Sequence, residues 1–402
     1  MPAVASPRRV VVIGAGVAGL TAARRLAMEG TEVLVLEARN RVGGRVWSHR
    51  LPNDEIVELG GEWISTSQTR LIDLVAELGL GLVDTGMDFT SRDPVGGPVI
   101  PDDEHERVGR ALVGRMEELG SERLAEITVA DLLAGLGQPG PAGAVLRSRL
   151  AGTAGAQLDR VSAGEIGEEF GVGDQGSYVR VDGGNDRLAK ALAAGLELRL
   201  ETVVVSVQQR GNEVGVITGN EELEAAAVVL AVPLPVLRRL VFDPALPEDV
   251  ALALDHVEMG KGIKMAVPTS EEPPMFRRQD TDIPAWYWTG LGPQGSVRRA
   301  VTGFAGTEPG VDAFLVDPMA RLARAAPEVD LGAPIVADWV SDPFAGGSYS
   351  VIGPGQRGLL EPLARPWGRV FLAGEHVNGS GTIVGAVESG EDAATRLLAT
   401  VF

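Results

Sequence analysis

The stretch Val10-Val-Val-Ile-Gly-Ala-Gly-Val-Ala-Gly-Leu20 decides the fold. Its apolar start runs into a glycine turn, and the apolar residues after the turn repeat with helical spacing, which predicts a buried strand over 9–13 and a helix over 17–29. Thr31 to Glu37 predicts a second strand, which ends on an acid 18 residues after Gly19. Glycines let the backbone approach a pyrophosphate, a helix amino terminus attracts it, and such an acid binds a ribose. The stretch therefore predicts a dinucleotide-binding site.

A competing interpretation takes Arg8-Arg9 and the apolar residues behind it as a twin-arginine export signal. The strand, turn and helix are preferred because the sequence up to Glu37 continues that pattern. No other stretch offers the roughly 18 uncharged apolar residues of a transmembrane helix, so we expect no membrane anchor and a cytoplasmic protein.

The composition bounds the size and excludes several kinds of site. A chain of 402 residues is about right for two domains, and 45% hydrophobic with 23% charged residues is typical of a globular protein. The net charge of −19 argues against nucleic-acid binding. The lack of cysteine excludes disulfides, thiolate metal sites, a cysteine nucleophile and a cysteine-tethered cofactor. None of the four histidines is spaced i, i+4 from another, so we expect no metal site.

Periodicity predicts short strands and helices along the rest of the chain. Helices are expected over 70–79, 105–119, 183–192 and 388–398. Strands are expected over 178–182, 198–208, 213–218, 227–232 and 369–373. Residues 284–304 are expected to form β-structure with Trp286 and Trp288 on one face and Tyr287 on the other. The Gly- and Pro-rich stretches over 93–101 and 135–143 are expected to be loops.

The segment after the ribose-binding acid indicates which dinucleotide is bound. Glu37-Ala-Arg39-Asn-Arg41-Val-Gly43-Gly44-Arg45 places three arginines and a glycine pair beside the first phosphate site, which suits a large, permanently held cofactor. Here the sequence resembles the flavin-containing amine oxidase family, which includes monoamine and polyamine oxidases. The other segments that carry the resemblance are 58–63, 181–184, 229–233, 339–350, 371–375 and 381–390.

The resemblance implies an α/β fold in which a Rossmann-like FAD-binding domain is interleaved with an α+β substrate-binding domain. The FAD-binding domain is expected over 1–84, 179–257 and 346–402, and the substrate-binding domain over 85–178 and 258–345. FAD is expected to be non-covalent, because Ser348 stands where some relatives carry a cysteine joined to the flavin. The residues implied to bind FAD are Gly14, Gly16, Ala18, Gly19, Glu37, Ala38, Arg39, Gly44, Arg45, Gly60, Gly61, Glu62, Trp63, Val204, Trp367, Gly374, Glu375, Thr382, Ile383 and Ala386.

The resemblance also implies roles beside the reacting atoms. Lys264 matches the lysine that contacts the flavin N5 through a water, and it is expected to be catalytic. Tyr349 matches one wall of the family's aromatic pair around the amine, while the opposite wall falls at Thr382, which is not aromatic. Trp288 is a candidate replacement, so the expected substrate residues are Tyr349, Trp288 and Thr382. Core packing is nevertheless the preferred interpretation of Trp286 and Trp288.

The implied reaction is oxidative deamination of a primary monoamine to an imine and aldehyde, with O2 reduced to hydrogen peroxide. A polyamine or diamine oxidase is the main alternative. An L-amino-acid oxidase is a weaker one, because Trp63 stands where such enzymes commonly place an arginine. His376, just after Glu375, is a candidate cofactor contact or a plain turn residue, and the turn residue is the preferred interpretation. The expected partners are a small-molecule amine and O2, and assembly into a homodimer is left open.

Overall fold

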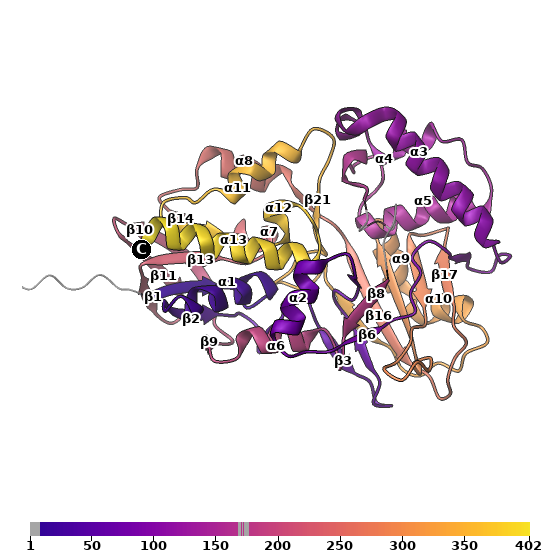
Figure 1. The fold of residues 1–402 in the computed structure, drawn as a ribbon, viewed down its shortest axis with the longest axis horizontal. Coiled ribbons are helices and arrows are strands. Elements are labelled where there is room, and N and C mark those ends of the chain that lie inside the picture. The colour runs from indigo at the N-terminus through magenta and orange to yellow at the C-terminus, as the bar shows by residue number, and fades with distance from the viewer. Residues whose placement is uncertain (1–8, 168–169, 171, 173–176) are drawn as a thin grey trace, which may run out of the picture.

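The computed structural model of the protein describes residues 9–167, 170, 172 and 177–402, so Arg8 of the arginine pair lies outside the described residues. The fold is α/β, and segments far apart in the sequence lie side by side. Helix α1 (Val17–Met28) packs along α13 (Ile383–Val401), which includes the helix expected over 388–398 and begins earlier (Figure 1). A Cβ on Gly390 would stand 2.3 Å from the Ala18 carbonyl oxygen, so a glycine is needed where the two helices meet.

A five-stranded parallel sheet carries the glycine turn, in the order β22-β13-β1-β2-β9. Val12 pairs with Val35 on one side and Val229 on the other, and all three are fully buried. Cover on both faces of the sheet explains the unbroken apolar run of the first strand. The strands are β1 (Arg9–Ile13), β2 (Glu32–Leu36), β9 (Glu197–Arg199), β13 (Ala227–Leu230) and β22 (Val370–Leu372).

The single strand expected over 198–208 is wrong, because the structure divides it between β9 and β10 (Val204–Arg210). Between them Glu201 adopts a φ of 52°, and the N–H groups of Glu201 and Thr202 donate to the carbonyl oxygens of Arg39 and Glu37. These bonds turn the chain across the end of the parallel sheet. β10 then joins a second sheet, β12-β11-β10-β14, with β11 (Glu213–Thr218), β12 (Glu222–Ala225) and β14 (Val241–Asp243).

A six-stranded sheet of order β20-β16-β19-β18-β17-β7 lies in the other part of the molecule. Trp286 and Trp288 face one side of it and Tyr287 the other, as predicted. The loop expected over 93–101 is wrong at residues 93–94, which pair with β17. The division into two domains at the expected boundaries stays a prediction. The strands are β7 (Asp93–Pro94), β16 (Gly262–Pro268), β17 (Arg277–Asp280), β18 (Ala285–Trp288), β19 (Ala300–Gly306) and β20 (Ile335–Asp338).

Helices and short sheets complete the two parts (Figure 1). α3 (Asp102–Glu126) extends beyond the helix expected over 105–119 and is kinked at Gly120, where φ is 72°. Across the described ranges, the structure has no helix with the length and apolarity that a membrane crossing requires. The other helices are α2 (Thr69–Glu77), α4 (Val129–Ala134), α5 (Pro141–Ala154), α6 (Asp186–Ala193), α7 (Leu234–Leu237), α8 (Glu248–His256), α9 (Glu308–Val316), α10 (Pro318–Ala325), α11 (Glu361–Ala364) and α12 (Glu375–Asn378). The short sheets pair β3 (Ser48–Arg50) with β4 (Ile56–Glu58), β15 (Glu258–Met259) with β21 (Ser350–Val351), and β8 (Tyr178–Val181) with β5 (Ile64–Ser65) and β6 (Leu82–Asp84).

Candidate active site

A cavity of about 1380 Å³ joins the carboxyl ends of the parallel strands to the six-stranded sheet and to α3. The structure brings most of the predicted site residues to this one cavity, although they come from distant segments. Those that line it are Gly14, Gly16, Ala18, Glu37, Ala38, Arg39, Gly44, Arg45, Gly60, Gly61, Glu62, Trp63, Val204, Lys264, Trp288, Tyr349, Gly374, Glu375, Thr382, Ile383 and Ala386.

The glycine turn has the geometry of a phosphate cradle. A Cβ on Gly14 would stand 2.5 Å from the Ala231 carbonyl oxygen, whereas a Cβ on Gly16 would meet no atom within 4 Å, because Gly16 faces the open cavity. Gly16 is also the N-cap of α1 and offers no side chain to its free N–H groups. Free N–H groups and the helix dipole attract an anion at this point.

Glu37 lies at the same end of the cavity, and two backbone N–H groups hold its carboxylate. Its carboxylate is 4% exposed and accepts the backbone N–H groups of Ala15, at 2.8 Å, and Arg39, at 2.9 Å. A carboxylate has about four lone-pair sites, so two remain for ribose hydroxyls. The two backbone bonds fix the orientation in which these sites face the cavity.

Two residues expected to bind the cofactor do not line the cavity. A Cβ on Gly19 would stand 2.0 Å from the Gly14 carbonyl oxygen, so Gly19 allows α1 to pack against the turn rather than a ligand to enter. Trp367 is partly buried and packs against Phe242, with 5.6 Å between the ring centroids, at the edge of a hydrophobic cluster. Its contact with the cofactor stays a prediction.

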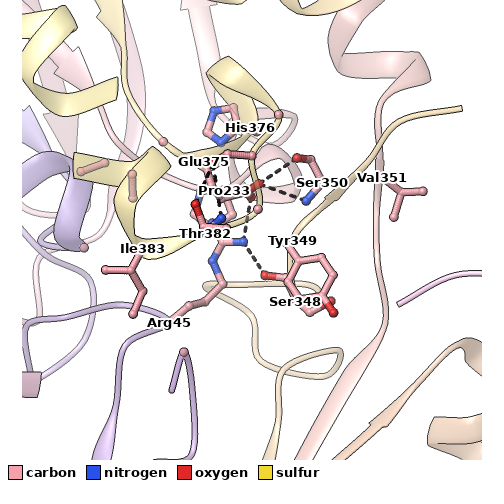
Figure 2. A pocket seen from close by; sticks show the side chains of 18 of the residues that line it. Arg45, Pro233, Ser348, Tyr349, Ser350, Val351, Glu375, His376, Thr382 and Ile383 are labelled. Atoms are coloured by element: carbon pink, nitrogen blue, oxygen red, sulfur yellow. Dashed lines mark hydrogen bonds and ion pairs between the residues drawn. The ribbon is translucent and has the colours of Figure 1, made fainter. Parts of the chain in front are cut away.

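Arg45 and Glu375 form the charged centre of the cavity (Figure 2). Arg45 Nη1 lies 2.9 Å from Glu375 Oε1 and donates to the Ser348 carbonyl oxygen at 2.5 Å. Ser350 donates to Glu375 Oε2 from its backbone N–H and from its hydroxyl. Burial opposes the charge on Glu375, but Arg45 and Ser350 outweigh it and keep the pKa of this carboxyl below its ordinary value. Glu375 is therefore an anion that holds Arg45 beside the cavity.

His376 is more than the turn residue expected from the sequence. It is 1% exposed and lines the cavity, and neither ring nitrogen has a hydrogen-bond partner among the described residues. Burial lowers the pKa of His376 to about 4, so the ring is neutral at physiological pH. The Gly374-Glu375 motif immediately before it is a sequence signal that could have pointed to a site role.

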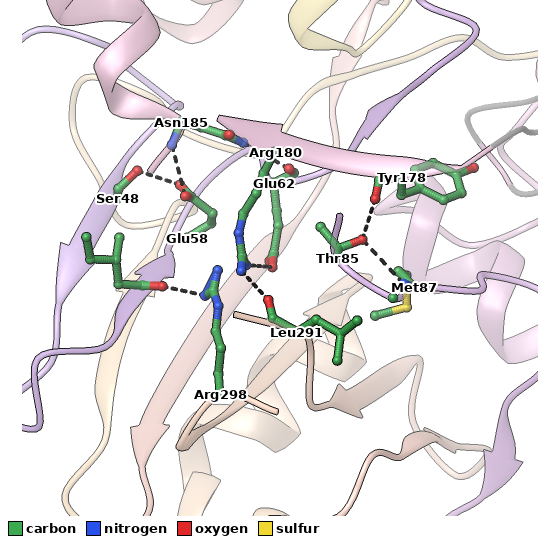
Figure 3. A network of polar contacts seen from close by, with 12 residues as sticks. Ser48, Glu58, Glu62, Thr85, Met87, Tyr178, Arg180, Asn185, Leu291 and Arg298 are labelled. Atoms are coloured by element: carbon green, nitrogen blue, oxygen red, sulfur yellow. Dashed lines mark hydrogen bonds and ion pairs between the residues drawn. The ribbon is translucent and has the colours of Figure 1, made fainter. Parts of the chain in front are cut away.

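Lys264 is buried at the opposite end of the cavity in a polar network. Its Nζ lies 2.6 Å from Glu62 Oε2 and 3.1 Å from the Gly60 carbonyl oxygen. Arg180 lies 3.9 Å from the other oxygen of Glu62, and Asn185 donates to the backbone carbonyls around it (Figure 3). The sequence indicated the lysine but gave no sign of Arg180 or Asn185, whose roles depend on the meeting of β8 with the 60–63 loop.

Glu58 is a second acid of this network, and its surroundings favour the protonated form. Glu58 is 1% exposed and accepts the Ser48 hydroxyl at 2.7 Å and the Asn185 N–H at 2.9 Å. Burial, which outweighs both hydrogen bonds, raises the pKa of Glu58 to about 7. Glu58 does not contact Lys264 directly, so Glu62 is the carboxylate that pairs with the lysine.

An aromatic wall stands beside Lys264. The rings of Trp286 and Trp288 are stacked, with 3.8 Å between their centroids, and Trp63 lies 5.7 Å from Trp288. Phe89 and Phe304 line the same part of the cavity. Trp286 and Trp288 are buried and also line the cavity, so core packing and a site role coexist here.

Tyr349 also lines the cavity, and its hydroxyl donates to the Thr153 carbonyl oxygen. Thr382, the N-cap of α13, accepts the Gly385 N–H at 3.1 Å. The amino terminus of α13 therefore opens on the cavity, and its dipole favours negative charge there. The described residues contain no group of three His, Asp or Glu side chains that could hold a metal.

Comparison with known proteins decides the family. A family model described as flavin containing amine oxidoreductase matches residues 17–398. The chain belongs to this family. As an amine oxidase family member, it is a flavin-dependent oxidoreductase with FAD as cofactor, and it acts on small-molecule amines. The resemblance seen in the sequence is thereby confirmed.

Two relatives and two solved structures illustrate the similarity. Nicotine dehydrogenase of Pseudomonas putida is 30% identical over 95% of this chain and 86% of the relative, and amine oxidase B of Bos taurus is 30% identical over 97% and 86%. Cyclohexylamine oxidase from Brevibacterium oxydans has a TM-score of 0.82 at 24% identity, covering 97% of this chain and 98% of that one. Putrescine oxidase bound to putrescine has a TM-score of 0.81 at 23% identity, covering 98% and 99%. The structural matches establish the fold.

The residues present fit FAD. The uncapped α1 amino terminus and the open face of Gly16 would hold the pyrophosphate, Glu37 the adenosine ribose, and Arg45 with Glu375 the middle of the cofactor. Bound FAD supplies the acceptor for the two electrons that leave the amine substrate.

We expect FAD to leave the protein on acid denaturation, because no cysteine is available and the Ser348 hydroxyl donates to the Lys261 carbonyl oxygen at 3.0 Å. The measurement is the visible spectrum of the supernatant and of the pellet after acid precipitation and centrifugation. Yellow colour that stays with the pelleted polypeptide would show a covalent bond and contradict the prediction.

Replacing Glu37 with Ala should weaken FAD binding while the chain stays folded. A charge-assisted contact of this kind contributes on the order of 1.5–3 kcal/mol, so the dissociation constant should rise about 10- to 150-fold. FAD occupancy after dialysis measures the effect, with circular dichroism to verify folding. Glu32→Ala is the matched control, since Glu32 is an exposed acid that pairs with Arg9 at the start of β2, the strand that Glu37 follows. Equal occupancy in Glu37→Ala and in the control would remove Glu37 from the cofactor site.

Proposed function

We propose that this amine oxidase oxidises primary monoamines with an apolar or aromatic tail, forming an imine that hydrolyses to an aldehyde and ammonia. The overall balance is one amine, one O2 and one water converted to one aldehyde, one ammonia and one hydrogen peroxide. The observation that carries the proposal is the aromatic wall of Trp63, Trp286 and Trp288 beside Lys264. Burial of an apolar substrate tail against such a wall contributes roughly 0.8 kcal/mol of binding free energy for each methylene.

The charges around this wall favour a substrate with one amine. Arg92 lies 3.8 Å from the centre of the Trp286 ring, and because the stacked Trp288 takes one face, Arg92 lies on the other. Lys264 Nζ lies 5.3 Å from the centre of Trp288. Both cations lie close to the aromatic pair, but Arg92 does not line the cavity and Lys264 is paired with Glu62, so the wall offers a second ammonium no free carboxylate.

Glu62, the carboxylate beside the aromatic wall, already has cationic partners. Glu62 is paired with Lys264 and lies close to Arg180, so it has no charge to spare for a substrate ammonium. Apolar and aromatic walls also penalise a charged amine, which favours the neutral amine from which a C–H can be removed. The Lys264 side chain contributes a fixed positive charge and N–H donors beside the reacting atoms.

One observation favours the diamine alternative. Glu126, at the end of α3, lines the outer part of the cavity, and it forms no ion pair within the portion of the chain that the structure describes. A diamine long enough to reach Glu126 would pair its second ammonium there. The ranking of amines by kcat/KM, argued in the Discussion, separates the two functions. The amino-acid alternative lacks support at Trp63, which lines the cavity where a carboxylate would need a cation.

A further inference from the structure

Glu62 is a buried acid held between two cations. Its side chain is 4% exposed, and its carboxylate oxygens lie 2.6 Å from Lys264 Nζ and 3.9 Å from Arg180 Nη1. The side chains of Lys264 and Arg180 are 5% and 4% exposed. Buried charges of this kind keep their charge only when each has a partner. The carboxylate of Glu62 is the partner that Lys264 has.

Hydrogen bonds to Asn185 and Arg45 hold the backbone around Glu62 in place. Asn185, which is fully buried, donates from Nδ2 to the carbonyl oxygens of Gly61, at 3.1 Å, and of Glu62, at 2.9 Å. The Gly61 N–H donates to the Arg45 carbonyl oxygen at 3.0 Å. The carboxylate therefore extends from a loop whose position is fixed on two sides (Figure 3).

Arg180 faces the other oxygen of the carboxylate at ion-pair distance. Arg180 belongs to β8, and its Nη2 donates to the Leu291 carbonyl oxygen at 2.5 Å (Figure 3). The guanidinium is thus tied to the segment that follows β18 while it faces Glu62. One oxygen of the Glu62 carboxylate therefore bonds Lys264, and the other faces a cation that is held in place by the Leu291 carbonyl oxygen.

The ammonium of Lys264 is consequently set in one orientation. An ammonium has three donors, and within the described chain two of them are used by Glu62 and by the Gly60 carbonyl oxygen. The third is left for a water or a ligand in the cavity that Lys264 lines. Without the carboxylate, the ammonium would keep one protein acceptor and no counter-charge.

We propose that Glu62 is a positioning residue, which acts through Lys264 by fixing its charge and by directing its third N–H into the cavity. This inference rests on the role proposed for Lys264. It gives Glu62 a role apart from direct contact with the cofactor, which the sequence had suggested. If Glu62 acts through Lys264, removing the charge of Glu62 should change the rate of flavin reoxidation only in an enzyme that still carries Lys264.

The test is a double-mutant cycle on the FAD-loaded enzyme with Glu62→Gln, Lys264→Met and the double variant. The readouts are the rate of flavin reoxidation by O2 in stopped flow and the midpoint potential of the bound flavin. In the enzyme that carries Lys264, we expect Glu62→Gln to slow flavin reoxidation about tenfold and to shift the midpoint potential of the flavin. In the Lys264→Met background, the same change should alter the reoxidation rate less than twofold. Glu55→Gln is the control, since this partly exposed acid is bonded to Arg299 and lies outside the network.

The double-mutant cycle distinguishes failure of the positioning role of Glu62 from failure of the role proposed for Lys264. If Glu62→Gln has the same effect with and without Lys264, or no effect in the parent, the positioning role is overturned. If Lys264→Met alone behaves as the parent, the role proposed for Lys264 fails instead. Should Glu62→Gln lose FAD, Glu62→Asp replaces it in the cycle, because it keeps the charge on a shorter side chain. A slowing of reoxidation by Glu62→Asp in the parent that disappears when Lys264 is already Met supports the proposal, and an equal fold-change in both backgrounds overturns it.

Discussion

Lys264→Met is expected to keep FAD bound and to slow flavin reduction, reoxidation or both by about 100-fold, the effect of removing one preorganised electrostatic group from a site that excludes water. Lys264 is 4% exposed, and its Nζ lies 2.6 Å from Glu62 and 3.1 Å from the Gly60 carbonyl oxygen. Methionine has a similar length and fills the space, but it supplies neither charge nor donor. The FAD cradle at Gly16 and Glu37 belongs to other elements, so cofactor retention should not change.

Stopped-flow absorbance of the two half-reactions is the measurement, with an amine in the absence of O2 and then O2 added to the reduced enzyme. Lys261→Met is the matched control, because Lys261 lies three residues earlier and contacts Ser348 through its backbone alone. The control should behave as the parent in both half-reactions. Traces for Lys264→Met that coincide with those of the parent would remove Lys264 from the mechanism.

The parts of the site that are local in sequence could be predicted from the sequence. Gly14, Gly16 and Glu37 act within one strand, turn and strand, and the constraints on each are backbone constraints that residue type reveals. The same reasoning gave β1, α1 and β2 nearly to the residue. Gly19 illustrates a limit, since the motif requires this glycine for packing and says nothing of contact with a ligand.

Features that depend on the meeting of distant segments could not be predicted. The pair of Glu62 with Lys264 joins residues 202 positions apart, and the acid is identified as its partner only when β16 is placed beside the 60–63 loop. The break at Glu201 depends on hydrogen bonds to the carbonyls of Arg39 and Glu37, which local periodicity does not contain. Trp367 shows a further limit, because its motif position does not reveal that its ring packs against Phe242 outside the residues that line the cavity.

A primary monoamine with an apolar or aromatic tail is expected to exceed putrescine, spermine and leucine about 100-fold in kcat/KM, which is about 2.7 kcal/mol in transition-state binding. A second ammonium beside the aromatic wall finds no free carboxylate there, because Glu62 is paired with Lys264, and Arg92 lies behind Trp286 outside the cavity lining. An unpaired charge taken out of water costs several kcal/mol, more than the difference expected here. Leucine brings a carboxylate, which finds no free cation beside Trp63 because Lys264 is already paired with Glu62.

The measurement is kcat/KM for benzylamine, hexylamine, putrescine, spermine and leucine, repeated with Glu126→Gln. If monoamines are the substrates, Glu126→Gln should leave kcat/KM for benzylamine and hexylamine unchanged, because the apolar tail of these amines needs no charged partner at Glu126. A tenfold preference of the parent for putrescine or spermine would contradict the monoamine assignment. If Glu126→Gln then abolished that preference, the acid at the end of α3 would be the site of the second ammonium, because Glu126 lines the cavity away from the cations that flank Trp286 and Trp288.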